Sequence, residues 1–351
     1  MSNNHILLFL FIFSIIWGNT LSARENPVEK EFKDFLKNYE SKVVPLEKEQ
    51  NVAYFNAAVS GKDEDYKKSE QLQIQMTKIY ANKQDFALLE KFKKSGGISD
   101  PLLKRQLQVI YLGYLGNQVN EKKLEELIKR QTAIEQKFST FRATVNGKQV
   151  TDNEINEALV KSKDSNELKN YWEGSKQIGQ VVAMDVIELV KLRNEVAKEL
   201  GFKNYHTMSL TLSEEDPQKI EKLFDELDQL TRDTFKKMKQ QLDTSLASQY
   251  GIHLNQMRPW HYHDRFFQEA PQIYQVDFDA FYKNTKVIDL AKQYYTGIGL
   301  EIDELASHSD LYEKEGKQQH AFCSAIDREG DVRVLENIVP NLKWMDTTLH
   351  E

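Results

Sequence analysis

Two adjacent side chains, those of His350 and Glu351, could together support hydrolysis at a metal ion. If a second histidine followed the glutamate after two arbitrary residues, the motif would be H-E-x-x-H, whose imidazoles share one face of a helix. Imidazoles in that arrangement bind Zn²⁺, and the glutamate between them can remove a proton from the metal-bound water. The dipeptide alone does not establish such a site, because a solvated helix end is the simpler interpretation.

Residues 258–264 form the other dense group of reactive side chains. His261 and His263 alternate, so their rings would share a face on a strand but not on a helix. A metal site at these histidines is one interpretation. The neighbouring Trp260 and Tyr262 favour another, in which this aromatic segment belongs to the core or to the wall of a cleft.

Two further side chains could act as nucleophiles but lack recognisable partners. Cys323 is the single cysteine of the chain, and we expect it to be a small buried residue. Ser324 follows it without a His/Asp arrangement to activate its hydroxyl, so serine catalysis is not expected. A single cysteine forms no internal disulfide, so the fold must rest on packing and on any bound metal.

The elements that position these residues are predicted to be mainly helical. Seven prolines and fifteen glycines in 351 residues leave room for long helices, and apolar residues recur at helical spacing. Pro45 is expected to kink or break the first helix, and Gly113 or Gly116 to interrupt the third. The expected helices cover residues 27–60, 67–92, 101–143, 151–160, 166–200, 217–250 and 279–296.

After residue 318 the helical pattern of the sequence gives way to β-prone segments. Two short β-prone runs, 321–326 and 332–338, flank a turn at 327–331, and this pattern predicts a β-hairpin. A final helix over 342–351 is expected to begin after Asn341. Residues 145–148 carry another turn signal. The fold class is therefore predicted as mainly α, with a small hairpin just before the helix that bears His350 and Glu351.

The net charge and the N-terminal apolar run indicate which partners and which cellular location to expect for the protein. The net charge of −7 and the isoelectric point near 5.8 argue against nucleic acid as a partner. Residues 6–17 are an apolar run of signal-peptide length, with processing expected after Ala23. We thus expect residues 1–23 to be a signal peptide, no membrane span after it, and a secreted or periplasmic, that is extracytoplasmic, location. An uncleaved N-terminal anchor is the alternative.

Several residues near the C-terminus occur in an order that is similar to a known family. They resemble the approach to the zinc motif in angiotensin-converting-enzyme-like (peptidyl-dipeptidase A) zinc metallopeptidases, and in this sequence they are His320-Ala321, Asp331-Val332-Arg333-Val334, Asn341 and His350-Glu351. The family has an aromatic residue where this chain has Val332. A second, weaker similarity covers Arg193 and the run Leu-Gly-Phe-Lys-Asn-Tyr at 200–205.

The resemblance implies roles for individual residues. With Zn²⁺ as cofactor, His350 would be a metal ligand and Glu351 the general base. His320 and Ala321 would start a strand at the cleft edge that binds the backbone of a peptide substrate by strand addition; a structural histidine is the alternative for His320. Two aromatic residues match a segment that reaches the substrate pocket, namely Trp260 and Tyr262.

The resemblance also implies a long-helix scaffold and a zinc-dependent peptidase for short peptides, of the peptidyl-dipeptidase or oligopeptidase type. In that family the remaining zinc ligands lie after the first His-Glu pair. We therefore expect residues 24–351 to be the N-terminal part of a metallopeptidase domain and inactive on their own. The alternatives are a non-catalytic, secreted helical binding protein on the same scaffold and a helical protein unrelated to peptidases.

Overall fold

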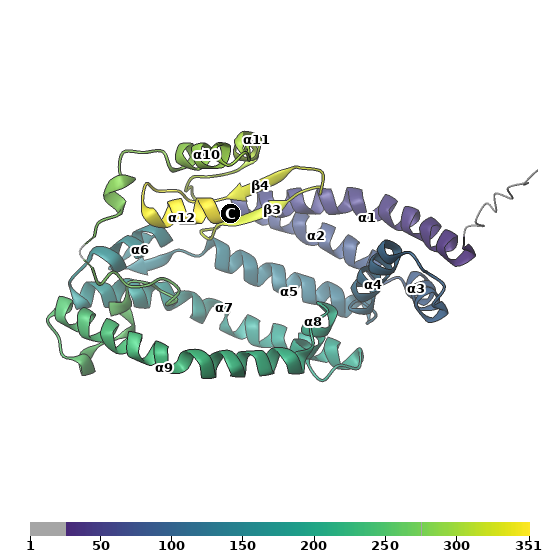
Figure 1. Ribbon diagram of the computed structural model, residues 1–351, viewed down its shortest axis with the longest axis horizontal. Coiled ribbons are helices and arrows are strands. Elements are labelled where there is room, and N and C mark those ends of the chain that lie inside the picture. Colours follow the sequence, from purple (N-terminus) through teal and green to yellow (C-terminus); the bar gives the residue numbers. More distant parts are fainter. Residues whose placement is uncertain (1–25, 275) are drawn as a thin grey trace, which may run out of the picture.

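A computed structural model describes residues 26–274 and 276–351 of the chain. The predicted signal peptide, residues 1–23, lies outside the described residues. As predicted, the described part is mainly helical, with two small two-stranded antiparallel sheets. Figure 1 shows the long helices α7 and α9 along one side and the two C-terminal strands with α12 on the other. No helix in the described ranges is long and apolar enough to cross a membrane.

The α-helices are α1 (Pro27–Ser60), α2 (Asp63–Tyr80), α3 (Lys83–Ser95), α4 (Pro101–Leu115), α5 (Glu121–Thr140), α6 (Asp152–Lys161), α7 (Ser165–Glu199), α8 (Tyr205–Leu212), α9 (Pro217–Tyr250), α10 (Val287–Gly297), α11 (Asp303–His308) and α12 (Leu342–His350). The 3₁₀ turns are η1 (Leu254–Gln256), η2 (Pro259–Tyr262) and η3 (Asp279–Phe281). The strands are β1 (Ala143–Val145), β2 (Lys148–Val150), β3 (Phe322–Ala325) and β4 (Val332–Leu335).

The N-terminal helices form an apolar core. Phe32 and Phe35 of α1 pack against Phe92 of α3, with ring centroids 5.3 and 6.2 Å from the Phe92 ring. Leucines of α4 complete this cluster. Pro45 lies inside α1 without ending it, so the expected break is wrong. A proline removes only one backbone hydrogen bond, and the long apolar face of α1 stabilises the helix on both sides of it.

The helix predicted over 67–92 is wrong in its extent, because α2 and α3 are separate helices. Asn82 separates them by capping the second: its side chain accepts hydrogen bonds from the backbone N–H groups of Gln84 and Asp85, both at 2.9 Å. Such a cap satisfies donors that a continuous helix would not expose. The predicted interruption at Gly116 is confirmed, since α4 ends at Leu115.

The turn at 145–148 belongs to a hairpin that the sequence analysis did not predict. Strand β1 pairs with β2, with Val145 opposite Lys148. Asn146 and Gly147 both have positive φ, 51° and 81°, as a tight hairpin turn requires. A capping box starts α6: Thr151 N–H donates to the Glu154 carboxylate and Glu154 N–H donates to Thr151 Oγ1.

The C-terminal hairpin is confirmed, and it packs on the middle of the first helix. Strand β3 pairs with β4 so that Phe322 lies opposite Leu335. Ile326 and Leu335 are fully buried against Phe55 and Ala58 of α1. Cys323 is exposed, so the prediction that it is buried is wrong. Side chains alternate along a strand, and Phe322 takes the inward direction.

The region between the long helices and the hairpin is less regular than expected. The helix predicted over 279–296 is replaced by the short turn η3 and by α10, which begins only at Val287. The carboxylate of Asp279 instead accepts a hydrogen bond from the Leu342 N–H at 2.9 Å. This bond satisfies one free donor at the start of α12. The short helices α8 and α11 were not predicted either.

Candidate functional site

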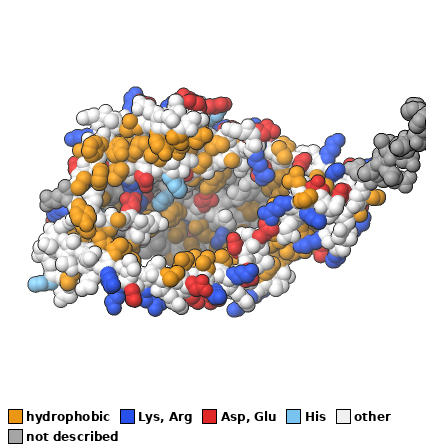
Figure 2. All heavy atoms as spheres, in the orientation of Figure 1, with side chains coloured by type: hydrophobic (Ala, Val, Ile, Leu, Met, Phe, Trp, Pro, Cys, Tyr) orange, Lys and Arg blue, Asp and Glu red, His pale blue; other side chains and the backbone are white. Residues whose placement is uncertain are grey.

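A large cleft is lined by the C-terminal helix α12, by α6 and by the second half of α9. Its volume is about 2280 Å³, and the irregular segment around residues 257–283 also lines it. Figure 2 shows a hollow on this face of the molecule, rimmed by hydrophobic side chains. A cleft of this size accommodates a small ligand or several residues of an extended peptide.

One face of α12 forms part of the cleft wall. Lys343, Asp346 and Thr347 line the cleft, whereas Trp344 and Met345 are buried in the core. Residues three, four and seven positions apart share a helix face. His350 is therefore the next side chain along the cleft-lining face, and it is exposed at the end of the helix.

Glu351 is half-buried and directly follows α12. Its N–H donates to the Thr347 carbonyl at 3.0 Å, continuing the hydrogen-bond pattern of α12. Its charge acts on β3: burial and then the Glu351 carboxylate raise the pKa of the exposed Cys323. The C-terminal end of α12 lies beside β3 in Figure 1. Glu351 therefore lies next to this strand.

The described residues do not bring together a metal site. Within residues 26–274 and 276–351, no group of three His, Cys, Asp or Glu side chains is placed to hold a metal ion. A catalytic zinc site needs three protein ligands and an open position. His350 and Glu351 are thus adjacent to the cleft but do not by themselves form a complete site.

His320 and Ala321 precede β3, which starts at Phe322. The exposed His320 ring stacks on Phe138 of α5, with centroids 5.9 Å apart and planes at 15°. Although part of the ring is open to solvent, burial against its neighbours lowers the pKa of His320. Ala321 packs instead against the apolar cluster around Trp344. Among the described strands, β3 pairs only with β4, so its other edge has no strand partner.

Trp260 and Tyr262 lie on η2 but have different surroundings. Tyr262 lines the cleft, and its hydroxyl lies 2.6 Å from Asp243 Oδ1 and 2.7 Å from Lys239 Nζ. Trp260 packs behind it on α7, 6.3 Å from the Trp172 ring. No hydrogen bond or ion pair between described residues joins these side chains, or His320, to His350 or Glu351. Their roles in binding substrate stay predictions.

His261 and His263 are core residues, as the second interpretation of that segment predicts. His261 Nδ1 accepts from the Arg258 N–H at 2.9 Å, so Nε2 donates to Ser165 Oγ at 2.9 Å. His263 Nδ1 accepts from the Gln272 N–H at 3.2 Å, and its Nε2 lies 2.9 Å from the Tyr250 hydroxyl. Burial lowers the pKa of His263 to about 4. All four ring nitrogens are engaged, which leaves none for a metal.

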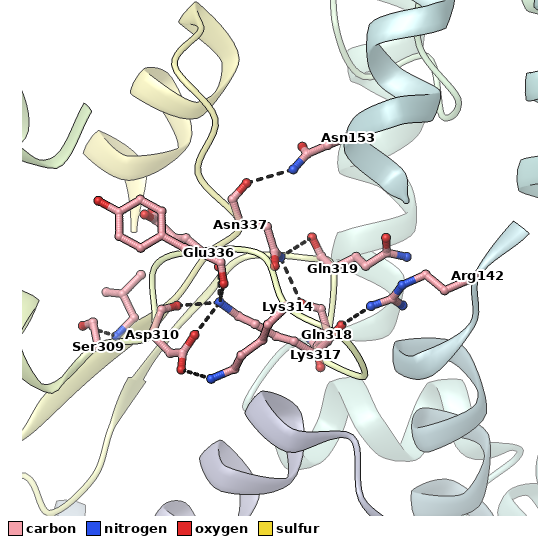
Figure 3. A network of polar contacts seen from close by, with 12 residues as sticks. Arg142, Asn153, Ser309, Asp310, Lys314, Lys317, Gln318, Gln319, Glu336 and Asn337 are labelled. Carbon is pink, nitrogen blue, oxygen red and sulfur yellow. Dashed lines mark hydrogen bonds and ion pairs between the residues drawn. The ribbon is translucent and has the colours of Figure 1, made fainter. Parts of the chain in front are cut away.

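A buried lysine that no sequence pattern predicts lies beneath the hairpin. Lys317 is fully buried, and its Nζ donates to Asp310 Oδ1 at 2.7 Å and to the Tyr312 carbonyl at 2.8 Å. It also donates to the carbonyls of Asp310 and Glu336. Figure 3 shows Lys317 at the centre of this cluster, reaching from the loop before β3 to Asp310 and Glu336. No signal in the sequence distinguishes Lys317 from an exposed loop lysine.

The same cluster ties the hairpin to neighbouring helices. Asn337 Nδ2 donates to the carbonyls of Gln318 and Gln319, both at 3.0 Å. Arg142, just before β1, donates to the Lys317 carbonyl at 2.7 Å, and Asn153 of α6 donates to the Asn337 carbonyl at 3.0 Å. These bonds fix the chain on both sides of the segment that leads to α12, and Figure 3 shows them converging there.

Comparison with known proteins identifies a family for the chain. The family model for angiotensin-converting enzyme, Peptidase_M2, matches residues 26–350. No curated protein matches the chain. The matched range extends from the first described residue through α12 and includes His350. Since the match covers nearly the whole sequence, the chain belongs to the angiotensin-converting-enzyme family of peptidases.

Proposed function

We propose that His350 is a zinc ligand and Glu351 the general base of a peptidase that acts on short peptides in the cleft. The observation that carries this proposal is that one face of α12 lines the cleft and leads to His350. Lys343, Asp346 and Thr347 line the cleft, and His350 is the next residue on that face. Family membership supports peptide hydrolysis and, more generally, a zinc-dependent mechanism.

The edge of β3 supports the choice of an extended peptide as substrate. This edge has no strand partner among the described residues, and the Glu351 charge reaches Cys323 on the same strand. A peptide added along β3 would exchange backbone hydrogen bonds with it. Glu351 would then be close enough to the substrate backbone to take a proton from the attacking water.

Of the described residues, only His350 is assigned to the zinc site, because no three of their His, Cys, Asp or Glu side chains are grouped to hold a metal. We propose that His350 binds zinc only together with ligands other than the described residues. Zinc, when bound by the full ligand set, would supply Lewis-acid activation of the scissile carbonyl.

The test is the zinc content of two purified proteins, the present chain and a version extended through the next stretch of its reading frame. We expect one zinc per extended chain and weak or no binding to the present one. Glu351→Gln should keep the metal in the extended protein and abolish cleavage of short peptides. Glu329→Gln, in the exposed hairpin turn, is the matched control and should retain both. An extended protein without zinc would contradict the proposal.

A second function, peptide binding without catalysis, is favoured by the lack of a three-ligand cluster in the described chain. In that case the cleft and the β3 edge would bind peptides on an inherited peptidase scaffold. Peptide binding that is unchanged by a zinc chelator, in an extended protein that cleaves nothing, would select this alternative.

A further inference from the structure

Glu336 is a buried carboxyl at the junction between the hairpin and α12. It follows the last residue of β4 and is fully buried. Its Oε2 lies 3.1 Å from Thr348 Oγ1 on α12, one turn before Glu351. Its Oε1 has no hydrogen-bond partner among the described residues. An ionised carboxylate with one free oxygen would be costly at this position.

The hydrogen atoms available indicate the state of this carboxyl. Thr348 Oγ1 also lies 2.7 Å from the Trp344 carbonyl. A hydroxyl carries one proton and a carbonyl can only accept, so the shorter contact uses the Thr348 proton. Both contacts are then satisfied when Glu336 itself is protonated and donates to Thr348 Oγ1. A protonated carboxyl also suits burial beside the negative Glu351.

The backbone of Glu336 is also hydrogen-bonded on both sides, through its carbonyl and its N–H. Its carbonyl accepts from the buried Lys317 ammonium, and its N–H donates to the Asp310 carbonyl at 2.9 Å. Asp310 in turn pairs with Lys317 at 2.7 Å. The side chain of Glu336 can therefore transmit the position of the loop cluster to α12. Burial raises the pKa of Glu336 to about 7 and the nearby Glu351 adds to this rise, although the Thr348 hydroxyl and the Lys317 ammonium act in the opposite direction.

We propose that Glu336, in its neutral form, is a positioning residue that latches α12 to β4 through Thr348 and so sets where Glu351 lies relative to β3. The functional meaning of this position rests on the proposed role of Glu351. The latch itself can be tested without metal, substrate or activity, so its failure and that of the proposed function are distinguishable.

Cys323 provides the probe, because it is the single cysteine, it is exposed, and its thiol responds to Glu351. The pH dependence of its alkylation rate reports the thiol pKa, since the thiolate is the reactive form. Glu351→Gln removes the carboxylate charge near Cys323 and should therefore lower the thiol pKa. The size of this shift is the reference against which the other variants are compared. A change in stability alone leaves this profile unchanged as long as the protein is folded.

Glu336→Gln is the conservative variant, because a neutral amide can still donate to Thr348. It should keep the profile of the unmodified chain. Glu336→Leu removes the donor and should shift the thiol pKa in the same direction as Glu351→Gln. Thr348→Val removes the acceptor and should do the same, which keeps the test informative if Glu336→Leu does not fold. Thr347→Val, the adjacent threonine without a contact to Glu336, should leave the profile unchanged.

Circular dichroism first establishes that each variant is folded at the pH values used. The latch is supported if Glu336→Gln matches the unmodified chain while Glu336→Leu and Thr348→Val shift the profile. An unchanged profile in folded Glu336→Leu and Thr348→Val overturns it. A shift in Glu336→Gln as large as that in Glu336→Leu also overturns it, because the neutral donor would then be insufficient.

Discussion

The hairpin β1–β2 is held on α7 by buried apolar contacts and by two exposed hydrogen bonds between Gln177 and the Thr144 backbone, whereas the hairpin β3–β4 ends in a buried polar cluster. Val145 and Val150 of the first pack with Ile155, Leu159 and Leu168. The second also has apolar contacts with α1, but beyond Leu335 its chain is fixed by Lys317, Glu336 and Asn337. The two hairpins are of similar length, and the difference lies in how their position is specified.

Apolar packing and buried hydrogen bonds constrain a segment in different ways. Apolar contacts have no preferred direction, so a small shift costs little if the volume is still filled. A buried ammonium needs its acceptors at fixed distances and angles. The apolar arrangement is sufficient for β1–β2, which only braces α6 and α7. The polar arrangement is found where the chain leads to α12 and to Glu351.

The most damaging change to the polar hairpin should be Lys317→Met. It leaves the Asp310 carboxylate and three carbonyls without their buried donor. We expect a loss of about 3–5 kcal/mol in the free energy of unfolding, measured by urea denaturation. Lys314→Met is the control, because Lys314 pairs with the same Asp310 but its side chain is 48% exposed. It should cost about 1 kcal/mol or less; equal losses would refute the importance of the buried cluster.

The next effect is a pH dependence that belongs only to the polar hairpin. Glu336 has a folded-state pKa of about 7 against an ordinary value of 4.5, so folding favours its protonated form. Its stabilising contribution is complete below pH 4.5 and is lost as the pH rises through 7. The loss amounts to at most about 3 kcal/mol. Urea denaturation between pH 5 and pH 8 should show this decline in the unmodified chain.

Glu336→Gln should make the decline between pH 5 and pH 8 smaller, because the amide does not titrate. Other titrating groups contribute to both proteins, so the difference between the two curves is the quantity of interest. Parallel curves would mean that Glu336 is ionised in the folded protein or titrates as it does in the unfolded chain.

A smaller effect is expected at the apolar hairpin. A Cβ added at Gly174 of α7 would lie 2.8 Å from Val145 Cγ2, whereas one added at Gly179 of the same helix meets no atom within 4 Å. Gly174→Ala should lower the free energy of unfolding by about 1–3 kcal/mol, because the hairpin must move away. Gly179→Ala should raise it by up to about 1 kcal/mol through helix propensity. Thermal or urea unfolding of both variants measures the difference in the free energy of unfolding. Equal changes in the two variants would show that β1 can move away from α7 at little cost.

The contrast between the hairpins also explains which parts of the fold could be predicted. Residues 321–338 contain two β-prone runs around a turn, long enough for the pattern to predict strands. Strands β1 and β2 have three residues each, too few for an alternation to stand out, so only their turn was predicted. The division between α2 and α3 was missed because Asn82 is neither Gly nor Pro, and its role as a cap depends on a local hydrogen bond.

The candidate site was predictable to the extent that it depends on local order along the chain. His350 and Glu351 follow a hairpin and a helix start, all of which are local features. Lys317 and Glu336 were missed because their burial results from contacts with β4, the preceding loop and α12, which are distant in sequence. The burial predicted for Cys323 was wrong because it depends on which face of β3 turns toward α1, and Phe322 occupies that face.

Helix α9 forms the wall of the cleft opposite α12, and it is packed against other elements mainly near its two ends. Every residue of α9 from 221 to 238 is exposed, and only Leu246 and Ala247 of that helix are buried. Helix α9 contacts α8 near its start and η1 after its end, and Figure 1 shows it running along the edge of the molecule. Its stiffness therefore comes from its own backbone hydrogen bonds. The exposed stretch from 221 to 238 adds no buried side chain, so the position of this wall depends on the two ends of α9 and on the contacts of Lys239 and Asp243 with Tyr262.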